Sequence, residues 1–63
     1  MNADMRLKLA RIAACVTQME LAQSAGVSEA LISKIETRRL TPSREVQEKI
    51  AARLGVRRWE VFT

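Results

Sequence analysis

The sequence contains no histidine and only one cysteine, and these two absences exclude several kinds of site. One cysteine cannot form a disulfide within the chain, and without histidine a structural zinc site has too few ligands. The only aromatic residues are one tryptophan and one phenylalanine, which disfavours a protein that stacks unpaired bases on aromatic side chains. No apolar run is long enough to span a membrane, and the N-terminus lacks the layout of a signal peptide. We therefore expect a soluble, cytoplasmic protein without a metal or a cofactor.

The length and charge of the chain narrow the class of protein further. Its 63 residues suffice for one small domain, residues 1–63, in which only about 60% of the surface of the unfolded chain can be buried. The net charge of +4, from eleven lysines and arginines against seven acids, favours an anionic partner, and nucleic acid first. No paired carboxylates or phosphate-binding loop are present, so we do not expect an enzyme.

The stretch from Thr17 to Glu36 predicts two short helices joined by a tight turn. Thr17 and Glu20 have the spacing of a capping box, in which each side chain bonds to the backbone N–H of the other residue. Ser28 is a suitable N-cap for the second helix. Between them, Gly26 permits the positive φ that such a turn requires. This stretch, residues 17–36, is called the motif below.

Helical periodicity continues on both sides of the motif. A first helix is expected from Asp4 to about residue 14, and its core-facing residues follow the i, i+3, i+4, i+7 rule: Leu7, Ala10, Arg11 and Ala14. After the motif, Thr41 is expected to cap a fourth helix whose first residue is Pro42 and which Gly55 ends. A short fifth helix is expected within residues 57–62. The fold class is therefore all-α, with five helices and no strand.

The motif resembles the helix-turn-helix of the Cro and phage-repressor family, which is also widespread in small bacterial regulators. The resemblance extends over roughly residues 6–62, and the matching residues are Gln18, Leu21-Ala22, Ala25-Gly26-Val27-Ser28, Ile32, Ile35-Glu36, Pro42 and Leu54-Gly55-Val56. It implies a compact repressor-like domain that binds double-stranded operator DNA in a sequence-specific manner, with helix 28–36 in the major groove. A transcriptional regulator, and specifically a repressor, is the expected function. The expected partner is an inverted-repeat operator bound by a homodimer.

The resemblance also assigns DNA contacts to particular positions. It places Gln18 on the DNA backbone and the base-contacting positions on Glu29, Ala30 and Lys34, with Ser28 and Ser33 alongside them. It places further backbone contacts on Arg38, Arg39 and Arg44. Chemically, Lys34 can donate to guanine and Ala30 can touch a thymine methyl group. Glu29 can accept from cytosine, or it can serve only to support the helix and to exclude wrong sequences. The alternative for the three arginines is ordinary solvated surface charge.

Three positions around the motif depend on how the helices pack. The resemblance implies a largely buried ion pair between Arg11 and Glu36, whereas an arginine without this context is most often solvated. Cys15 and Arg38 stand where the family usually has glycine, so each residue either adopts a positive φ or the turn differs there. For the thiol of Cys15 we favour a small buried side chain over a reactive one.

The alternative function is that of an antitoxin-like or adaptor protein whose main role is to bind another protein. Leu9 and Ile12 give the first helix a second apolar side, at positions where the family usually has charged residues. The residues expected to form a surface for a dimer or a protein partner are Leu9, Ile12, Trp59, Val61 and Phe62.

Overall fold

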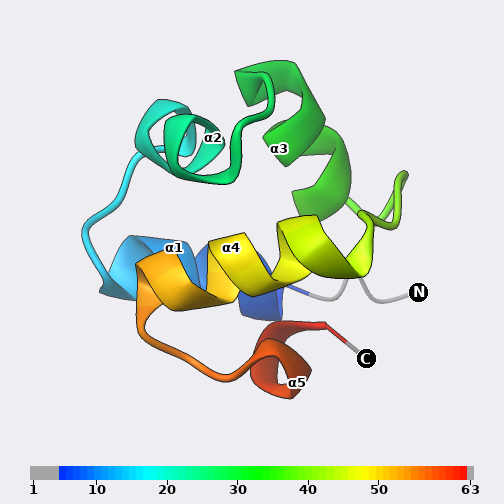
Figure 1. Cartoon of the computed structure of the whole chain (residues 1–63). Coiled ribbons are helices and arrows are strands. Elements are labelled where there is room, and N and C mark those ends of the chain that lie inside the picture. The colour runs from blue at the N-terminus through cyan, green and yellow to red at the C-terminus, as the bar shows by residue number, and fades with distance from the viewer. Residues whose placement is uncertain (1–4, 63) are drawn as a thin grey trace.

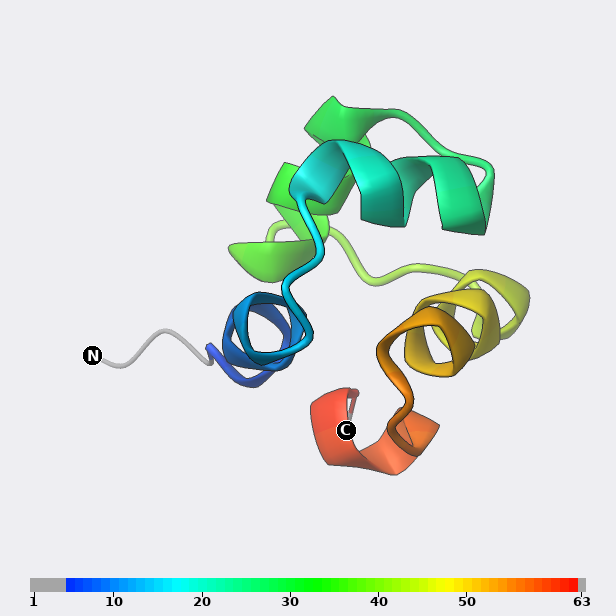
Figure 2. The same cartoon turned by 90° about the vertical axis from the view of Figure 1, so that its left-hand side faces the viewer.

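The computed structural model describes residues 5–62 and contains five helices and no strand in that range, which confirms the expected fold class (Figure 1). The helices are α1 (Arg6–Ala13), α2 (Gln18–Ala25), α3 (Glu29–Glu36), α4 (Arg44–Leu54) and α5 (Arg58–Val61). Two perpendicular views place α2 and α3 at one end of the molecule and α5 at the other, with α1 and α4 between them (Figures 1 and 2). Within the described part of the chain, no helix has the length and apolar character needed to cross a membrane.

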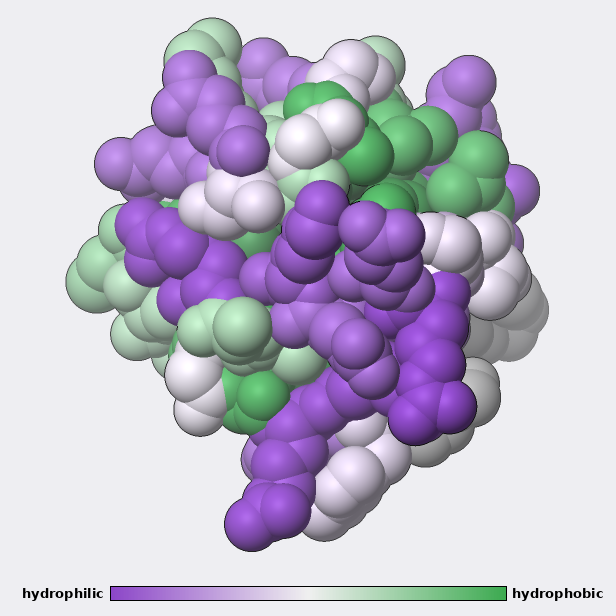
Figure 3. Space-filling view, in the orientation of Figure 1, coloured by the Kyte–Doolittle hydropathy of each residue, from purple (hydrophilic) through white to green (hydrophobic). Residues whose placement is uncertain are grey.

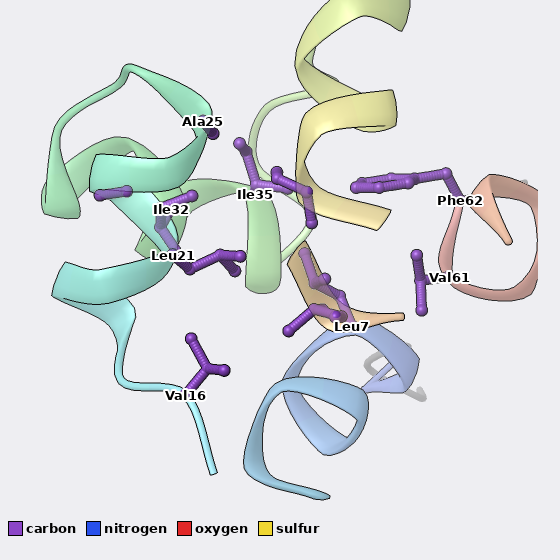
Figure 4. Close-up of a cluster of buried hydrophobic side chains, with 11 residues drawn as sticks. Leu7, Val16, Leu21, Ala25, Ile32, Ile35, Val61 and Phe62 are labelled. Carbon is purple, nitrogen blue, oxygen red and sulfur yellow. The ribbon is translucent and has the colours of Figure 1, made fainter. Parts of the chain in front are cut away.

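The core is formed by apolar side chains from all five helices, which meet in the centre of the molecule (Figure 4). Leu21, Ile32 and Ile50 are the largest side chains that are completely buried, and they come from α2, α3 and α4. Alanines at 22 and 25 are buried on the inner face of α2, where small side chains allow α3 to approach closely. The helix pair of the motif therefore rests directly on the core of the whole domain.

The first helix is shorter than its periodicity predicts. Leu7 is buried and Ala10 is half-buried, but Ala14 is exposed, so the expectation for Ala14 was wrong. The reason is that the backbone turns out of the helix at Cys15, which has a φ of +59°. The Cys15 side chain is exposed on this turn, so the prediction of a buried thiol was also wrong. The proposed helix start at Asp4 lies outside the described residues.

The fourth helix begins two residues later than predicted. Ser43, not Thr41, is the N-cap, and its Oγ accepts a hydrogen bond from the Val46 N–H at 3.3 Å. Pro42 is buried in the preceding loop, where its carbonyl accepts from the side-chain Nε2 of Gln47 at 3.0 Å. The proline therefore fixes the path of the loop and does not open the helix.

Two residues other than glycine have left-handed backbone conformations, Cys15 with a φ of +59° and Arg38 with a φ of +63°. A side chain in this conformation costs about 1–2 kcal/mol, and glycine removes that cost but loses roughly 0.5–1 kcal/mol in chain entropy. At both positions the sequence left two alternatives, a positive φ or a different turn. Both residues adopt the positive φ.

Replacing Cys15 with glycine is expected to raise the free energy of unfolding by about 0.5–1 kcal/mol, because relief of the left-handed conformation exceeds the entropic loss. Ala14→Gly is the matched control, since Ala14 has a φ of −83° and has no strain to relieve. It should lower the free energy of unfolding by about 0.5–1 kcal/mol. Urea denaturation measures both values. Equal effects of the two substitutions would show that the turn at Cys15 carries no strain.

Candidate nucleic-acid interface

The N-terminus of α2 is fixed by the predicted capping box. The Thr17 Oγ1 accepts from the Glu20 N–H at 3.0 Å, and the Thr17 N–H donates to Glu20 Oε1 at 2.9 Å. The backbone of Thr17, and then its hydroxyl, lower the pKa of the Glu20 carboxyl below its ordinary value, and the charge of Arg53 acts in the same direction. Glu20 therefore stays ionised through mildly acidic pH, and the first turn of α2 keeps its cap there.

The turn between α2 and α3 has the geometry that the sequence predicts. Gly26 ends α2 with a φ of +72°, and no atom lies within 4 Å of the place where its Cβ would be. Glycine is therefore favoured here by the backbone conformation and not by lack of space. Two residues later the Ser28 Oγ accepts from the Leu31 N–H at 3.1 Å and caps α3. The two caps and the glycine set the angle at which α3 leaves α2.

One face of α3 is buried and the other is open to solvent. Ile32, Ile35 and Glu36 are buried against the domain. The residues expected to contact bases all lie on the exposed side of the helix or at its N-cap: Ser28, Glu29, Ala30, Ser33 and Lys34. Their side chains are short except for those of Glu29 and Lys34, so the backbone of α3 can approach a binding partner closely. The structure thus brings the predicted base-contacting residues together on one accessible surface.

The far end of α3 is held by an ion pair with α1. Arg11 Nε donates to Glu36 Oε2 at 2.6 Å, and Arg11 Nη2 donates to the other carboxylate oxygen at 3.5 Å. The exposed fractions of the two side chains are only 12% for Arg11 and 3% for Glu36. Arg11 Nη1 also donates to the carbonyl of Val16 at 2.9 Å, so the same guanidinium holds the loop before α2. The ion pair implied by the family resemblance is therefore present in the structure.

Gln18 belongs to the same cluster, which the sequence did not indicate. Its Nε2 donates to Glu36 Oε1 at 3.0 Å, and this links the first residue of α2 to the last residue of α3. A glutamine amide nitrogen carries two N–H groups, so this hydrogen bond leaves the second one available. Arg11, Gln18 and Glu36 together fix the relative positions of α1, α2 and α3. Only the three-dimensional structure reveals this role of Gln18, because residues 18 and 36 share no local spacing pattern.

Cationic side chains extend from the end of α3 to the start of α4. Arg38, Arg39 and Arg44 are all exposed. Arg44 Nε donates to Glu48 at 3.2 Å, but both side chains are largely exposed, and such a surface pair contributes at most about 1 kcal/mol. The Arg44 charge can therefore exchange this partner for another anion. Farther along α4, hydrophilic residues cover the face turned toward the viewer in Figure 3.

The predicted contact surface for another protein is smaller than expected. Val61 and Phe62 are buried in the core, with exposed fractions of 3% and 7%, so assigning them to that surface was wrong. Leu9, Ile12 and Trp59 are exposed by 58%, 52% and 62%. Val61 and Phe62 close the core against α1 and α4, so their side chains are not available for contact with another protein.

A comparison with protein families found one match, to a family described as a helix-turn-helix domain, over residues 5–61. This match includes all five helices. No curated protein matches the chain.

Proposed function

Because this chain belongs to a family of helix-turn-helix domains, which bind DNA, we propose that it is a transcriptional regulator that reads an operator with α3 in the major groove. The proposal takes residues 1–63 as one DNA-binding domain that acts in the cytoplasm, and it assigns no catalytic activity or cofactor. A repressor is the expected type, because the domain can block a promoter simply by occupying it. The observation that carries the proposal is the exposed face of α3, which is held at both ends by caps and buried polar contacts.

Base readout is assigned to the residues on this face. Lys34 donates to O6 and N7 of guanine, and Ala30 contacts a thymine methyl group. Ser28 and Ser33 lie beside them and can donate or accept. Glu29 lies in the first turn of α3, where its negative charge interacts favourably with the helix dipole. The same charge disfavours DNA sequences that would bring a phosphate or a base acceptor close to it.

Contacts with the DNA backbone are assigned to the groups around α3. The second N–H of Gln18 is available for a phosphate at the N-terminus of α2, where the helix dipole also favours an anion. Arg38, Arg39 and Arg44 supply positive charge after the C-terminal end of the recognition helix and at the start of α4. Such contacts fix the register and add affinity without reading sequence.

We further propose that two copies bind one inverted repeat. A symmetric dimer places its two recognition helices about 34 Å apart, which is one turn of the DNA helix. Each copy then contributes the same three arginines and the same exposed face of α3. The dimer therefore makes twice as many DNA contacts as one domain and binds the operator more tightly.

Substituting Lys34 and Arg39 separately tests the division between reading and positioning. Lys34→Ala should relax preference at one base pair of each half-site and cost about 1–3 kcal/mol on the preferred sequence, because a specific base contact is lost. Arg39→Ala should weaken binding to every duplex by a similar factor. Affinities for the preferred duplex and for its single-base variants measure both effects. The reverse pattern would show that α3 does not face the bases.

The second candidate function is that of an adaptor or antitoxin-like protein, and the exposure of Leu9, Ile12 and Trp59 favours it. Leu9 and Ile12 are three residues apart and lie on one side of α1, as a helix-binding surface requires. Copurification with a partner that is lost in Leu9→Ser, Ile12→Ser, while DNA binding is kept, would support this function in addition to operator binding.

A further inference from the structure

A hollow lies where α1, the start of α2 and the last turns of α3 meet. Its volume is about 240 Å³, and the residues that line it are Met5, Lys8, Gln18, Ser33, Glu36 and Thr37. Ser33 belongs to the exposed face of α3, and Gln18 is the residue that we assign to the DNA backbone at the start of α2. In both cartoon views the end of α3 lies beside α1 (Figures 1 and 2). The hollow therefore adjoins both surfaces that are proposed to contact DNA.

Glu36 is the one acid among the described residues of this wall, and its charge is compensated inside the protein. Its Oε2 accepts from Arg11 Nε at 2.6 Å, and its Oε1 accepts from Gln18 Nε2 at 3.0 Å. The Glu36 side chain is only 3% exposed. The pair of Arg11 and Glu36 thus adds no net charge, and Lys8 gives the hollow its positive charge.

Lys8 is an exposed residue of α1, one helical turn before Arg11. Within residues 5–62 its side chain takes part in no hydrogen bond or ion pair. A lysine ammonium has three N–H donors at the end of a flexible four-carbon stem. No contact with the described part of the chain has to be broken before this ammonium binds an anion. An exposed lysine is most often simply solvated, but Lys8 lies beside a side chain that is already assigned to DNA.

The position of Gln18 indicates where such an anion would lie. Glu36 fixes the Gln18 amide and uses one of its two N–H groups, which leaves the other for a phosphate. Lys8 borders the same hollow, so a phosphate on the free N–H of Gln18 lies at the edge of a space that the ammonium can reach. The share of one water molecule in the liquid is about 30 Å³, so the hollow has room for phosphate oxygens together with ordered water.

We propose that Lys8 is a further contact to the DNA backbone and that its ammonium binds the same phosphate as the Gln18 amide. This inference rests on the proposed function, in which α3 occupies the major groove. Positive charge then lies at two places along the recognition helix, at Lys8 beside α2 and at the arginines that follow its C-terminal end. Contacts of this kind fix the position of the domain on the duplex and add affinity without reading sequence.

The first test compares operator affinity across a salt series for the wild type, Lys8→Gln and Lys8→Arg. Lys8→Gln should reduce the magnitude of the slope of log K against log salt by about one for each copy, and hence by about two for the dimer. The preferred duplex and its single-base variants should lose affinity by the same factor. Lys8→Arg keeps the charge and should keep the slope. The three arginines account for their own part of the slope, which Lys8→Gln leaves in place.

Lys49→Gln is the matched control, because it removes the same charge from an exposed lysine on α4. Lys49 does not border the hollow, and it pairs only with Glu45 on its own helix, at 3.4 Å. Its substitution should change the slope much less than Lys8→Gln does. Equal changes in the two variants would show that the effect of Lys8 is general attraction between a basic protein and DNA, and would overturn the proposal.

The second test locates the contact on the DNA. Operator duplexes are prepared with an uncharged methylphosphonate in place of one backbone phosphate at a time, and their affinities are compared with that of the unmodified operator. One position in each half-site should weaken binding of the wild type and have little further effect on Lys8→Gln, because the charge that recognises that phosphate is already absent. A scan in which every position affects both proteins equally would contradict a specific contact by Lys8.

A purely structural role for Lys8 gives a different pattern. The ammonium lies near the last turn of α3, where a cation also stabilises the carbonyl end of a helix. If this were its whole role, Lys8→Gln would lower the urea midpoint of unfolding and leave the salt slope and the methylphosphonate scan unchanged, which would overturn the proposal. A steep slope in the wild type together with that result would leave the proposed function intact. A wild type that binds every duplex equally with no salt dependence would refute both.

Discussion

Arg11→Ala is expected to destabilise the domain by about 3–5 kcal/mol, because it leaves the carboxylate of Glu36 buried without its cation. The same substitution removes the hydrogen bond from Arg11 to the Val16 carbonyl, which holds the loop before α2. A core of this size rarely supplies more than about 3–5 kcal/mol of stability. A large fraction of Arg11→Ala molecules should therefore be unfolded at room temperature, as circular dichroism and urea denaturation would show.

Two further variants identify the cause of this loss. Arg53→Ala removes an exposed arginine from α4 and should change the free energy of unfolding by no more than about 0.5 kcal/mol. Replacing both partners, Arg11→Met with Glu36→Leu, should restore much of the stability, because no buried charge is then left without a partner. An Arg11→Ala protein as stable as Arg53→Ala would mean that the buried ion pair does not hold α1 to α3.

Operator binding is expected to weaken roughly a thousandfold between about 50 and 200 mM salt, because each phosphate contact releases condensed counterions. Three arginines in each of two copies give six such contacts, and a slope of about −0.9 for each contact gives about −5 for log K against log salt. The neutral amide of Gln18 adds a phosphate contact without adding to this slope. Fluorescence anisotropy across a salt series measures the slope directly.

The arginine variants separate this effect from general attraction between a basic protein and DNA. Arg39→Ala should reduce the magnitude of the slope by about one for each copy, and hence by about two for the dimer. Arg53→Ala removes the same charge from a residue outside the proposed contacts and should change the slope much less. A slope near zero in the wild type, or equal changes in both variants, would contradict the assignment of the loop arginines to the DNA backbone.

Local sequence signals were sufficient to predict the caps of the motif and its turn. The Thr17–Glu20 capping box, the Ser28 cap and Gly26 each depend on residues within a few positions of one another, and the structure contains all three. The start of α4 shows the limit of such signals. Thr41-Pro42 and Ser43 are both suitable beginnings for a helix, and the burial of Pro42 decides between them.

Interactions between distant parts of the chain could be predicted only where a family resemblance supplied them. The Arg11–Glu36 pair came from the resemblance, whereas the bond from Gln18 to Glu36 and the link from Arg58 through Gln47 to Pro42 have no sequence signature. Apolar character was equally ambiguous for Val61 and Phe62, because a hydrophobic residue near a chain end suits a core or a contact surface. Their burial depends on the fold of α5 against α1 and α4, which local patterns do not specify.

The most direct test of the central claim, that α3 reads an operator as part of a symmetric dimer, is selection of bound duplexes from a random DNA pool. The account predicts enrichment of an inverted repeat whose half-sites are one helical turn apart, about 34 Å. Repeating the selection with Lys34→Ala should give the same repeat with one relaxed position in each half-site. A pool that shows no sequence enrichment, or the same enriched positions with Lys34→Ala as with the wild type, would contradict the claim that α3 reads the operator.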